Sequence, residues 1–179
     1  GPFMDGESLH EIIKAENCNK TCAVPTVMTI LIDHLDNKSL QIPSMSKIYI
    51  GGSAVPISMI ERFETRYDVE VNHGWGMTET VVGTFNCHLP FMDELNFEQR
   101  MKVRCKQGRP PFGLEMKIVD DEGHSLPHDG IAFGKLMVRG PRVIERYYRA
   151  EESALDSEGW FDTGDVSTID KHGFMQITD

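Results

Sequence analysis

The chain has 179 residues, of which 40% are hydrophobic and 26% charged, and its formal net charge at pH 7 is −10. This composition excludes a disordered tail and predicts a globular protein with one or two small cores. The acidic balance argues against binding to a nucleic-acid backbone or an anionic membrane surface, and it favours a small-molecule ligand.

The four cysteines form no CxxC pair and no metal-like cluster with histidine, which argues against a zinc site and a disulfide framework. No apolar run approaches the ~20 residues of a membrane span, and no signal-peptide pattern opens the chain. We therefore expect a cytoplasmic protein without a transmembrane segment. The sequence leaves its oligomeric state open.

The first elements predict helices and strands in alternation. Ser8-x-x-Glu11 is a capping-box pattern at the start of a helix. A short strand over 21–24 is followed by Pro25, which suits the first turn of a second helix. The β-branched and aromatic run 47–50 predicts another strand, which ends at Gly51.

The pattern continues with a second capping box, Ser58-x-x-Glu61, and a strand over Val69–His73. This alternation predicts a parallel sheet with right-handed crossover helices. The loops "GGSA" (51–54) and "GWGMTE" (74–79) both follow predicted strands, so they should open on the same edge of the sheet. Ligands of parallel sheets bind at this edge, outside the carboxyl ends of the strands.

Residues 87–107 predict a helical connection, and the character of the chain changes near Gly108. Short alternating segments separated by Gly, Pro and Asp-Glu-Gly turns then predict a small, distorted antiparallel β-barrel or sheet. We expect a partial α/β nucleotide-binding subdomain over 1–107 and an antiparallel β subdomain over 108–179.

The 74–79 loop combines groups that suit a nucleotide. Trp75, between two glycines, could stack on a planar base, although a loop tryptophan is also a common core anchor. The Thr78 hydroxyl can bond a phosphate oxygen, and the Glu79 carboxylate is the kind of oxygen ligand that Mg²⁺ prefers. His73 is the histidine adjacent to this site.

A second candidate lies in "GWFDTGD" (159–165). Asp165 could accept hydrogen bonds from both ribose hydroxyls, as an acidic residue does in other nucleotide folds. An ordinary hairpin turn is the alternative interpretation of this Gly-Asp pattern.

Several motifs occur in an order and spacing that resembles the acyl-adenylate-forming (AMP-binding) superfamily, in particular its medium- and long-chain fatty-acyl-CoA synthetases. They are "GGSAVP", "GWGMTET", "GRP", "GKLMVRGP" with "RYY", and "GWFDTGDVSTIDKHGFMQITD". The resemblance covers nearly the whole chain, and the ordered set is far more specific than any single motif.

The resemblance implies that ATP and a carboxylate form an acyl-adenylate, whose acyl group then passes to coenzyme A. It assigns Thr78 to the α-phosphate, Glu79 to Mg²⁺ and Asp165 to the ribose. Thr78 and Glu79 are thereby the expected catalytic residues, with Glu79 as the metal ligand. The expected cofactor-binding residues are Gly51, Gly52, Ser53, Ala54, His73, Gly74, Trp75, Gly76, Met77, Thr78 and Asp165.

Trp75 stands where the family more often has Tyr, and the family's glycine-rich phosphate loop and C-terminal domain with its catalytic lysine are not in this sequence. We therefore expect a fragment of a larger enzyme, inactive by itself. Gly1-Pro2 resembles a cleavage remnant, and the chain stops at Asp179 where the family's hinge would begin. An adenylation domain for an amino acid or aryl acid, or a non-catalytic nucleotide- or acyl-binding module, remains an alternative.

Overall fold

The computed structural model describes residues 4–81 and 83–178, so the expectations for Gly1-Pro2 and Asp179 lie outside the described residues. The chain forms two compact units. The first contains Gly1–Gly74 and His88–Cys105, and the second contains Trp75–Cys87 and Lys106–Asp179. The segment 75–87 thus belongs with the second unit, whereas the single subdomain boundary near Gly108 stays a prediction.

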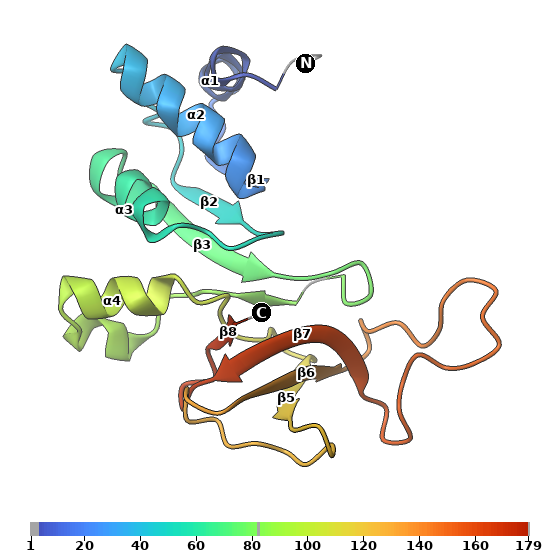
Figure 1. The fold of residues 1–179 in the computed structure, drawn as a ribbon. Coiled ribbons are helices and arrows are strands. Elements are labelled where there is room, and N and C mark those ends of the chain that lie inside the picture. Colours follow the sequence, from blue (N-terminus) through green and yellow to red (C-terminus); the bar gives the residue numbers. More distant parts are fainter. Residues whose placement is uncertain (1–3, 82, 179) are drawn as a thin grey trace. The chain divides into compact units, whose positions relative to one another are not determined.

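The first unit is built on the predicted parallel strands (Figure 1). The strands are β1 (Lys20–Ala23), β2 (Lys47–Ile50) and β3 (Glu70–Trp75), with β2 between the other two. Helices α2 (Pro25–Lys38) and α3 (Ile57–Arg66) make the crossovers. The remaining helices are α1 (Gly6–Ala15), η1 (Pro90–Glu94) and α4 (Phe97–Arg104). The prediction of a parallel sheet with crossover helices is confirmed.

Two predicted helix starts are wrong in their capping residues. Helix α1 begins at Gly6, and its N-cap is Asp5, whose carboxylate accepts the backbone N–H of Ser8 at 2.8 Å. Helix α3 begins at Ile57 after Pro56, without a side-chain cap. In α1 the earlier Asp5 satisfies a free backbone N–H of the first turn. In α3 the fixed φ of Pro56 lets the helix start at Ile57, one residue before Ser58.

The core of the first unit consists of apolar side chains from both crossover helices and from the strands between them. Leu31, Ile32, Leu35, Ile48, Ile60, Phe63 and Val71 are all fully buried. The alternation of buried and half-buried residues in β2 is that of a strand with one fully covered face. In the described part of the chain no helix has the length and hydropathy to cross a membrane.

The second unit contains a four-stranded antiparallel sheet in sequence order. Its strands are β5 (Glu115–Val119), β6 (Phe133–Arg139), β7 (Phe161–Ile169) and β8 (Met175–Ile177). Figure 1 shows β7 as a long, strongly curved strand. The short strand β4 (Thr84–Phe85) also belongs to this unit, where Phe85 pairs with Arg109. The predicted antiparallel β subdomain is confirmed as a sheet of this kind.

A cluster around Asp36 links α2 to α3 in the first unit. The Asp36 carboxylate accepts the hydroxyl of Tyr67 at 2.5 Å, lies 2.8 Å from Nη1 of Arg66 and also pairs with Arg62. The Tyr67 hydrogen bond and the two arginines lower the pKa of Asp36, against its partial burial. Burial, followed by the bond to Asp36, raises the pKa of Tyr67 to about 12. The carboxylate is therefore charged and the hydroxyl protonated at neutral pH.

We predict that Asp36→Ala destabilises the first unit by roughly 1.5–3 kcal/mol, the usual contribution of hydrogen bonds to a charged group. Asp33→Ala is the matched control, because Asp33 is on the same helix, is 54% exposed and makes one contact with Arg62 at 3.1 Å. Its cost should stay below about 0.5 kcal/mol. Urea unfolding followed by circular dichroism measures both, and equal costs would contradict the role of Asp36.

Candidate nucleotide site

The glycine loop after β2 lies close to the end of β3. A Cβ atom on Gly51 would lie 2.9 Å from the carbonyl oxygen of Gly74, so glycine is required for this approach. Gly52 has φ +87°, in the left-handed region. Ser53 and Ala54 follow in the same exposed turn before α3. The structure therefore brings the predicted residues 51–54 beside the end of β3, within the first unit.

His73 is buried at the end of β3, with 1% of its surface exposed. Its Nδ1 lies 2.8 Å from the carbonyl oxygen of Cys105, so Nδ1 carries the proton and donates. Burial lowers the pKa of His73, although the Cys105 and Ser53 backbones act in the opposite direction. Nε2 is buried and makes no hydrogen bond within the described residues. The neutral ring thus holds an unused hydrogen-bond acceptor.

Strand β3 continues further than the sequence predicts. We expected a strand over Val69–His73 with the loop starting at Gly74, but β3 covers Glu70–Trp75. Trp75 belongs to the second unit, where it is 9% exposed and packs in the apolar cluster of that unit. The prediction that Gly74 and Trp75 lie in a loop is therefore wrong. Apolar packing of the Trp75 side chain stabilises the extended backbone at the end of β3.

Gly83 covers part of the Trp75 ring. A Cβ atom built on Gly83 would lie 2.3 Å from Cε3 of Trp75 and 2.3 Å from its carbonyl oxygen. No larger residue fits there without moving the ring or the strand. The sequence analysis did not identify Gly83, and a single glycine in "VVG" carries no local signal for such a contact.

The Trp75 side chain also has a polar partner. Its indole Nε1–H donates to Oδ2 of Asp165 at 2.8 Å, which joins two of the predicted site residues 90 positions apart. Asp165 is half-buried in β7 and is not in a turn, so the hairpin-turn interpretation of "GWFDTGD" is wrong.

An irregularity in the β6–β7 ladder sets the position of Asp165. The pairing register of β6 with β7 shifts between Lys135 and Met137. Within this irregularity, Oγ1 of Thr163 donates to the Leu136 carbonyl at 2.9 Å. Gly164 has φ +77°, which a glycine adopts without strain. The motif's Thr-Gly-Asp therefore forms a β-bulge that directs the Asp165 side chain away from the regular alternation of the strand.

The segment after β3 is a tight turn in which Thr78 is exposed and Glu79 half-buried. Thr80 is buried and closes the turn, because its Oγ1 bonds both the N–H and the carbonyl of Met77 at 3.2 Å. The Thr78 hydroxyl makes no hydrogen bond within residues 4–81 and 83–178. Glu79 is half-buried, and its Oε1 accepts the hydroxyl of Tyr147 at 3.1 Å. The sequence analysis included Tyr147 only within the "RYY" motif and gave it no role.

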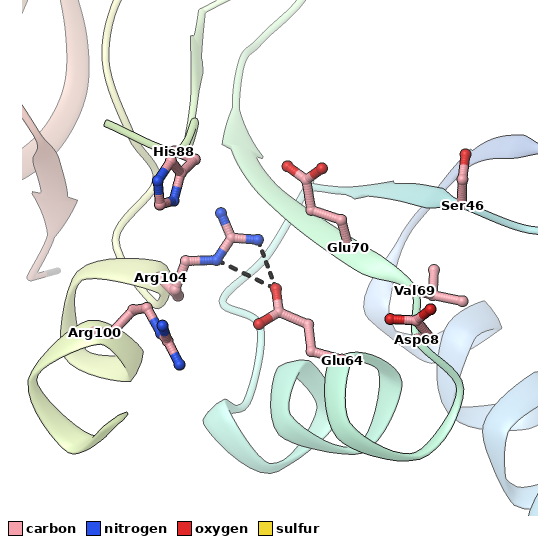
Figure 2. Close-up of a pocket in the computed structure, with 8 residues that line it drawn as sticks. All are labelled: Ser46, Glu64, Asp68, Val69, Glu70, His88, Arg100 and Arg104. Carbon is pink, nitrogen blue, oxygen red and sulfur yellow. Dashed lines mark hydrogen bonds and ion pairs between the residues drawn. The ribbon is translucent and has the colours of Figure 1, made fainter. Parts of the chain in front are cut away.

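A charged cavity of about 400 Å³ lies elsewhere in the first unit (Figure 2). It is bordered by Ser46, just before β2, and by Glu70, the first residue of β3, so it lies at the amino ends of these strands. Two of its carboxylates are in ion pairs, with Arg104 2.6 Å from Glu64 and Lys47 2.9 Å from Glu70. Ligands of parallel sheets bind at the opposite, carboxyl ends, so this cavity is separate from the candidate site.

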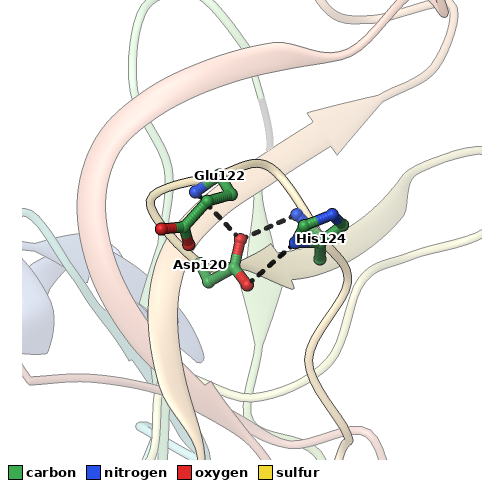
Figure 3. Close-up of side chains that lie close together, drawn as sticks. All are labelled: Asp120, Glu122 and His124. Atoms are coloured by element: carbon green, nitrogen blue, oxygen red, sulfur yellow. Dashed lines mark hydrogen bonds and ion pairs between the residues drawn. The ribbon is translucent and has the colours of Figure 1, made fainter.

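Asp120, Glu122 and His124 also lie close together, in the loop after β5 (Figure 3). Oδ1 of Asp120 accepts the backbone N–H of Glu122 at 3.0 Å and that of His124 at 2.8 Å. The His124 backbone bond, followed by the His124 side chain, lowers the pKa of Asp120. These bonds are those of a turn in which the aspartate holds the chain, as the sequence predicts for this segment.

The parallel strands with their glycine loops, and the antiparallel sheet with Asp165 on β7, define an α/β protein with a candidate nucleotide site. The sequence profile described as "AMP-binding enzyme" matches residues 1–148. The chain belongs to this family.

Curated relatives match along the whole chain. It is 44% identical to the medium-chain-fatty-acid–CoA ligase of Ectopseudomonas oleovorans and 43% identical to the 3-methylmercaptopropionyl-CoA ligase of Ruegeria lacuscaerulensis. Each alignment covers 100% of this chain and 33% of the relative. The chain thus spans about a third of the length of the curated relatives that it matches.

Solved structures show the same fold. The long-chain-fatty-acid-CoA ligase of Archaeoglobus fulgidus superposes with a TM-score of 0.79 at 24% identity, over 98% of this chain and 36% of that one. The o-succinylbenzoate coenzyme A synthetase of Bacillus subtilis, in complex with ATP and magnesium, gives a TM-score of 0.78 at 26% identity. That match covers 98% of this chain and 34% of the other.

We predict that Trp75→Phe destabilises the second unit by roughly 1.5–3 kcal/mol, because a smaller aromatic ring replaces the indole and Asp165 loses a charge-assisted donor. In an Asp165→Asn background the same change should cost less, with a coupling energy of ~0.5–3 kcal/mol. Chemical unfolding of the four proteins in the cycle measures the coupling.

Trp160→Phe is the control for this cycle, since Trp160 is similarly buried at 8% exposure but contacts Lys117 and Arg139 through its ring. Its effect should be the same with and without Asp165→Asn. Additive costs for Trp75→Phe and Asp165→Asn would show that the Trp75–Asp165 bond does not contribute to stability.

Proposed function

We propose that the full-length protein is an ATP-dependent ligase that joins a carboxylic acid to coenzyme A through an acyl-adenylate. The observation that carries this proposal is the turn that holds the exposed Thr78 and the half-buried Glu79, in the same compact unit as the Trp75–Asp165 pair. The curated relatives support it, since three that are 42–44% identical along the whole chain are described as CoA ligases.

The reaction has two steps. A carboxylate oxygen of the acid attacks the α-phosphorus of ATP, the bond from that phosphorus to the bridging oxygen breaks, and pyrophosphate leaves. The sulfur of coenzyme A then attacks the acyl carbonyl, AMP leaves with the electrons of the acyl–oxygen bond, and the thiol proton passes to solvent. Thr78 would donate its free hydroxyl to an α-phosphate oxygen as charge develops there.

The nucleoside contacts follow from the side chains that the structure leaves available. Nε2 of His73 is an acceptor that suits the amino group of adenine, and the Trp75 ring would stack on the base. Asp165 uses Oδ2 for Trp75, which leaves Oδ1 to accept the ribose hydroxyls. Glycines 51, 52, 74 and 76 and the backbone of Ser53, Ala54 and Met77 would allow close approach of the nucleotide to the main chain.

Glu79 is the residue that would hold Mg²⁺. Its carboxylate is a hard oxygen ligand, it is half-exposed, and within the described residues no hydrogen bond reaches Oε2. These features fit the ion. When bound, Mg²⁺ would neutralise charge on the phosphate groups of ATP. The Bacillus subtilis relative, described in complex with ATP and magnesium ion, supports this assignment.

The proposed substrates are aliphatic carboxylic acids, and medium-chain fatty acids are the first to test. Relatives of nearly equal identity, 43% and 44%, are described with different acyl groups, so identity does not select a chain length. Apolar pockets discriminate by only ~1–3 kcal/mol per methylene. The four free cysteines support a cytoplasmic enzyme. A series of fatty acids from C4 to C18, set beside amino and aryl acids in ATP–pyrophosphate exchange, tests the class of acid.

We predict that Glu79→Gln in the full-length enzyme lowers ATP–pyrophosphate exchange by about 10²- to 10³-fold. Its affinity for a preformed acyl-adenylate should change far less, because the phosphates that leave in the first step are absent from that ligand. Exchange kinetics and isothermal titration with a non-hydrolysable acyl-adenylate analogue measure the two effects.

Glu98→Gln is the control, since Glu98 is 78% exposed and pairs with Lys102 on the surface of α4. It should leave both measurements unchanged. Equal losses of exchange and of analogue affinity in Glu79→Gln would contradict the assignment. Nucleotide binding by the wild type without exchange for any acid would favour the non-catalytic binding module.

A further inference from the structure

Glu79 is held by one distant segment through both its backbone and its side chain. The N–H of Ile144 donates to the Glu79 carbonyl at 2.8 Å, and the hydroxyl of Tyr147 donates to Oε1 at 3.1 Å. All three residues lie in the second unit. Two bonds to one residue fix the turn and the carboxylate together, which is more than loop packing alone requires.

The segment that carries Tyr147 is itself held in place. Val143 and Ile144 pack against the apolar cluster of the second unit, and the Glu145 carbonyl accepts the N–H of Ala154 at 2.9 Å. The Tyr147 carbonyl accepts the N–H of Ala150 at 3.1 Å. Tyr147 is therefore presented to Glu79 from a segment with its own packing and hydrogen bonds.

Tyr147 has one proton to donate, and it goes to Glu79. Partial desolvation, followed by Glu79, raises the pKa of Tyr147, so the hydroxyl remains a donor across the neutral range. The neighbouring Tyr148 is 88% exposed, and within the described residues its hydroxyl makes no hydrogen bond, although its ring contacts Arg149. Of the two adjacent tyrosines, Tyr147 is therefore the one whose hydroxyl bonds Glu79.

We infer that Tyr147 is a positioning residue for a divalent cation: it holds Oε1 of Glu79 and leaves Oε2 to bind the cation. This inference rests on the proposed function. Mg²⁺ demands near-ideal ligand geometry, so a carboxylate held in one orientation binds it better than a mobile one. Outer hydrogen bonds to metal ligands commonly contribute 10- to 100-fold in metal affinity.

The test is Tyr147→Phe in the full-length protein, with Tyr148→Phe as the matched control. Mn²⁺ binding in the presence of a non-hydrolysable ATP analogue, followed by electron paramagnetic resonance, is the readout that does not depend on turnover. We expect the Mn²⁺ affinity to fall about 10-fold in Tyr147→Phe and to be unchanged in Tyr148→Phe. The Mg²⁺ concentration for half-maximal pyrophosphate exchange should rise by a similar factor, with the rate largely restored at saturating Mg²⁺.

A purely structural role for Tyr147 has a different signature. It would lower the melting temperature or the maximal rate while leaving the cation dependence as in the wild type, and that result would overturn the inference. Tyr147→Phe added to Glu79→Gln should cause no further loss of Mn²⁺ affinity. An additional loss in the double variant would show that Tyr147 acts by another route.

The same data separate the inference from the proposed function. If the wild type binds no Mn²⁺ with the nucleotide analogue, the assignment of Glu79 fails and the inference fails with it. If the wild type binds Mn²⁺ and Glu79→Gln loses it, while Tyr147→Phe matches the wild type, the inference alone fails.

Discussion

The hydrogen bond from the Trp75 indole to Asp165 is the constraint on which the candidate site residues of the second unit depend. A tryptophan ring that is 9% exposed needs a partner for its N–H, and here that partner is a carboxylate 2.8 Å away. The bond orients the ring and the carboxylate at once, because each restricts the rotamers of the other. Gly83 keeps the space beside the ring free of a side chain. The same two side chains therefore make a structural contact and are candidates for binding a ligand.

The core-anchor and base-stacking interpretations of Trp75 are consequently compatible. The ring packs in the apolar cluster of its unit, which is the property expected of an anchor. An anchored ring also presents its remaining surface in one orientation, which a base-stacking role requires. Substitution to alanine would remove both properties, so only changes that keep an aromatic side chain, such as phenylalanine, can separate them.

Each carboxylate of the candidate site is held by a residue far away in the sequence. Asp165 is held by Trp75, 90 positions earlier, and Glu79 by Tyr147, 68 positions later. In the first unit, His73 is held through the Cys105 carbonyl in the same manner. Such long-range bonds limit the motion of these side chains, and preorganised groups of this kind lower the cost of binding a charged ligand.

The sequence by itself determined the class of fold, the order of the motifs and the residue types able to hold a nucleotide. Hydrophobic periodicity, Pro25 and the glycines are local signals, so they predicted the crossover helices, the parallel strands and the antiparallel second unit. Only the tertiary structure decided that β3 continues through Trp75, that Asp165 lies on a bulge in a strand, and that Gly83 and Tyr147 belong with the site. Those features depend on contacts between distant residues, and no local pattern of side chains records which distant atoms will meet.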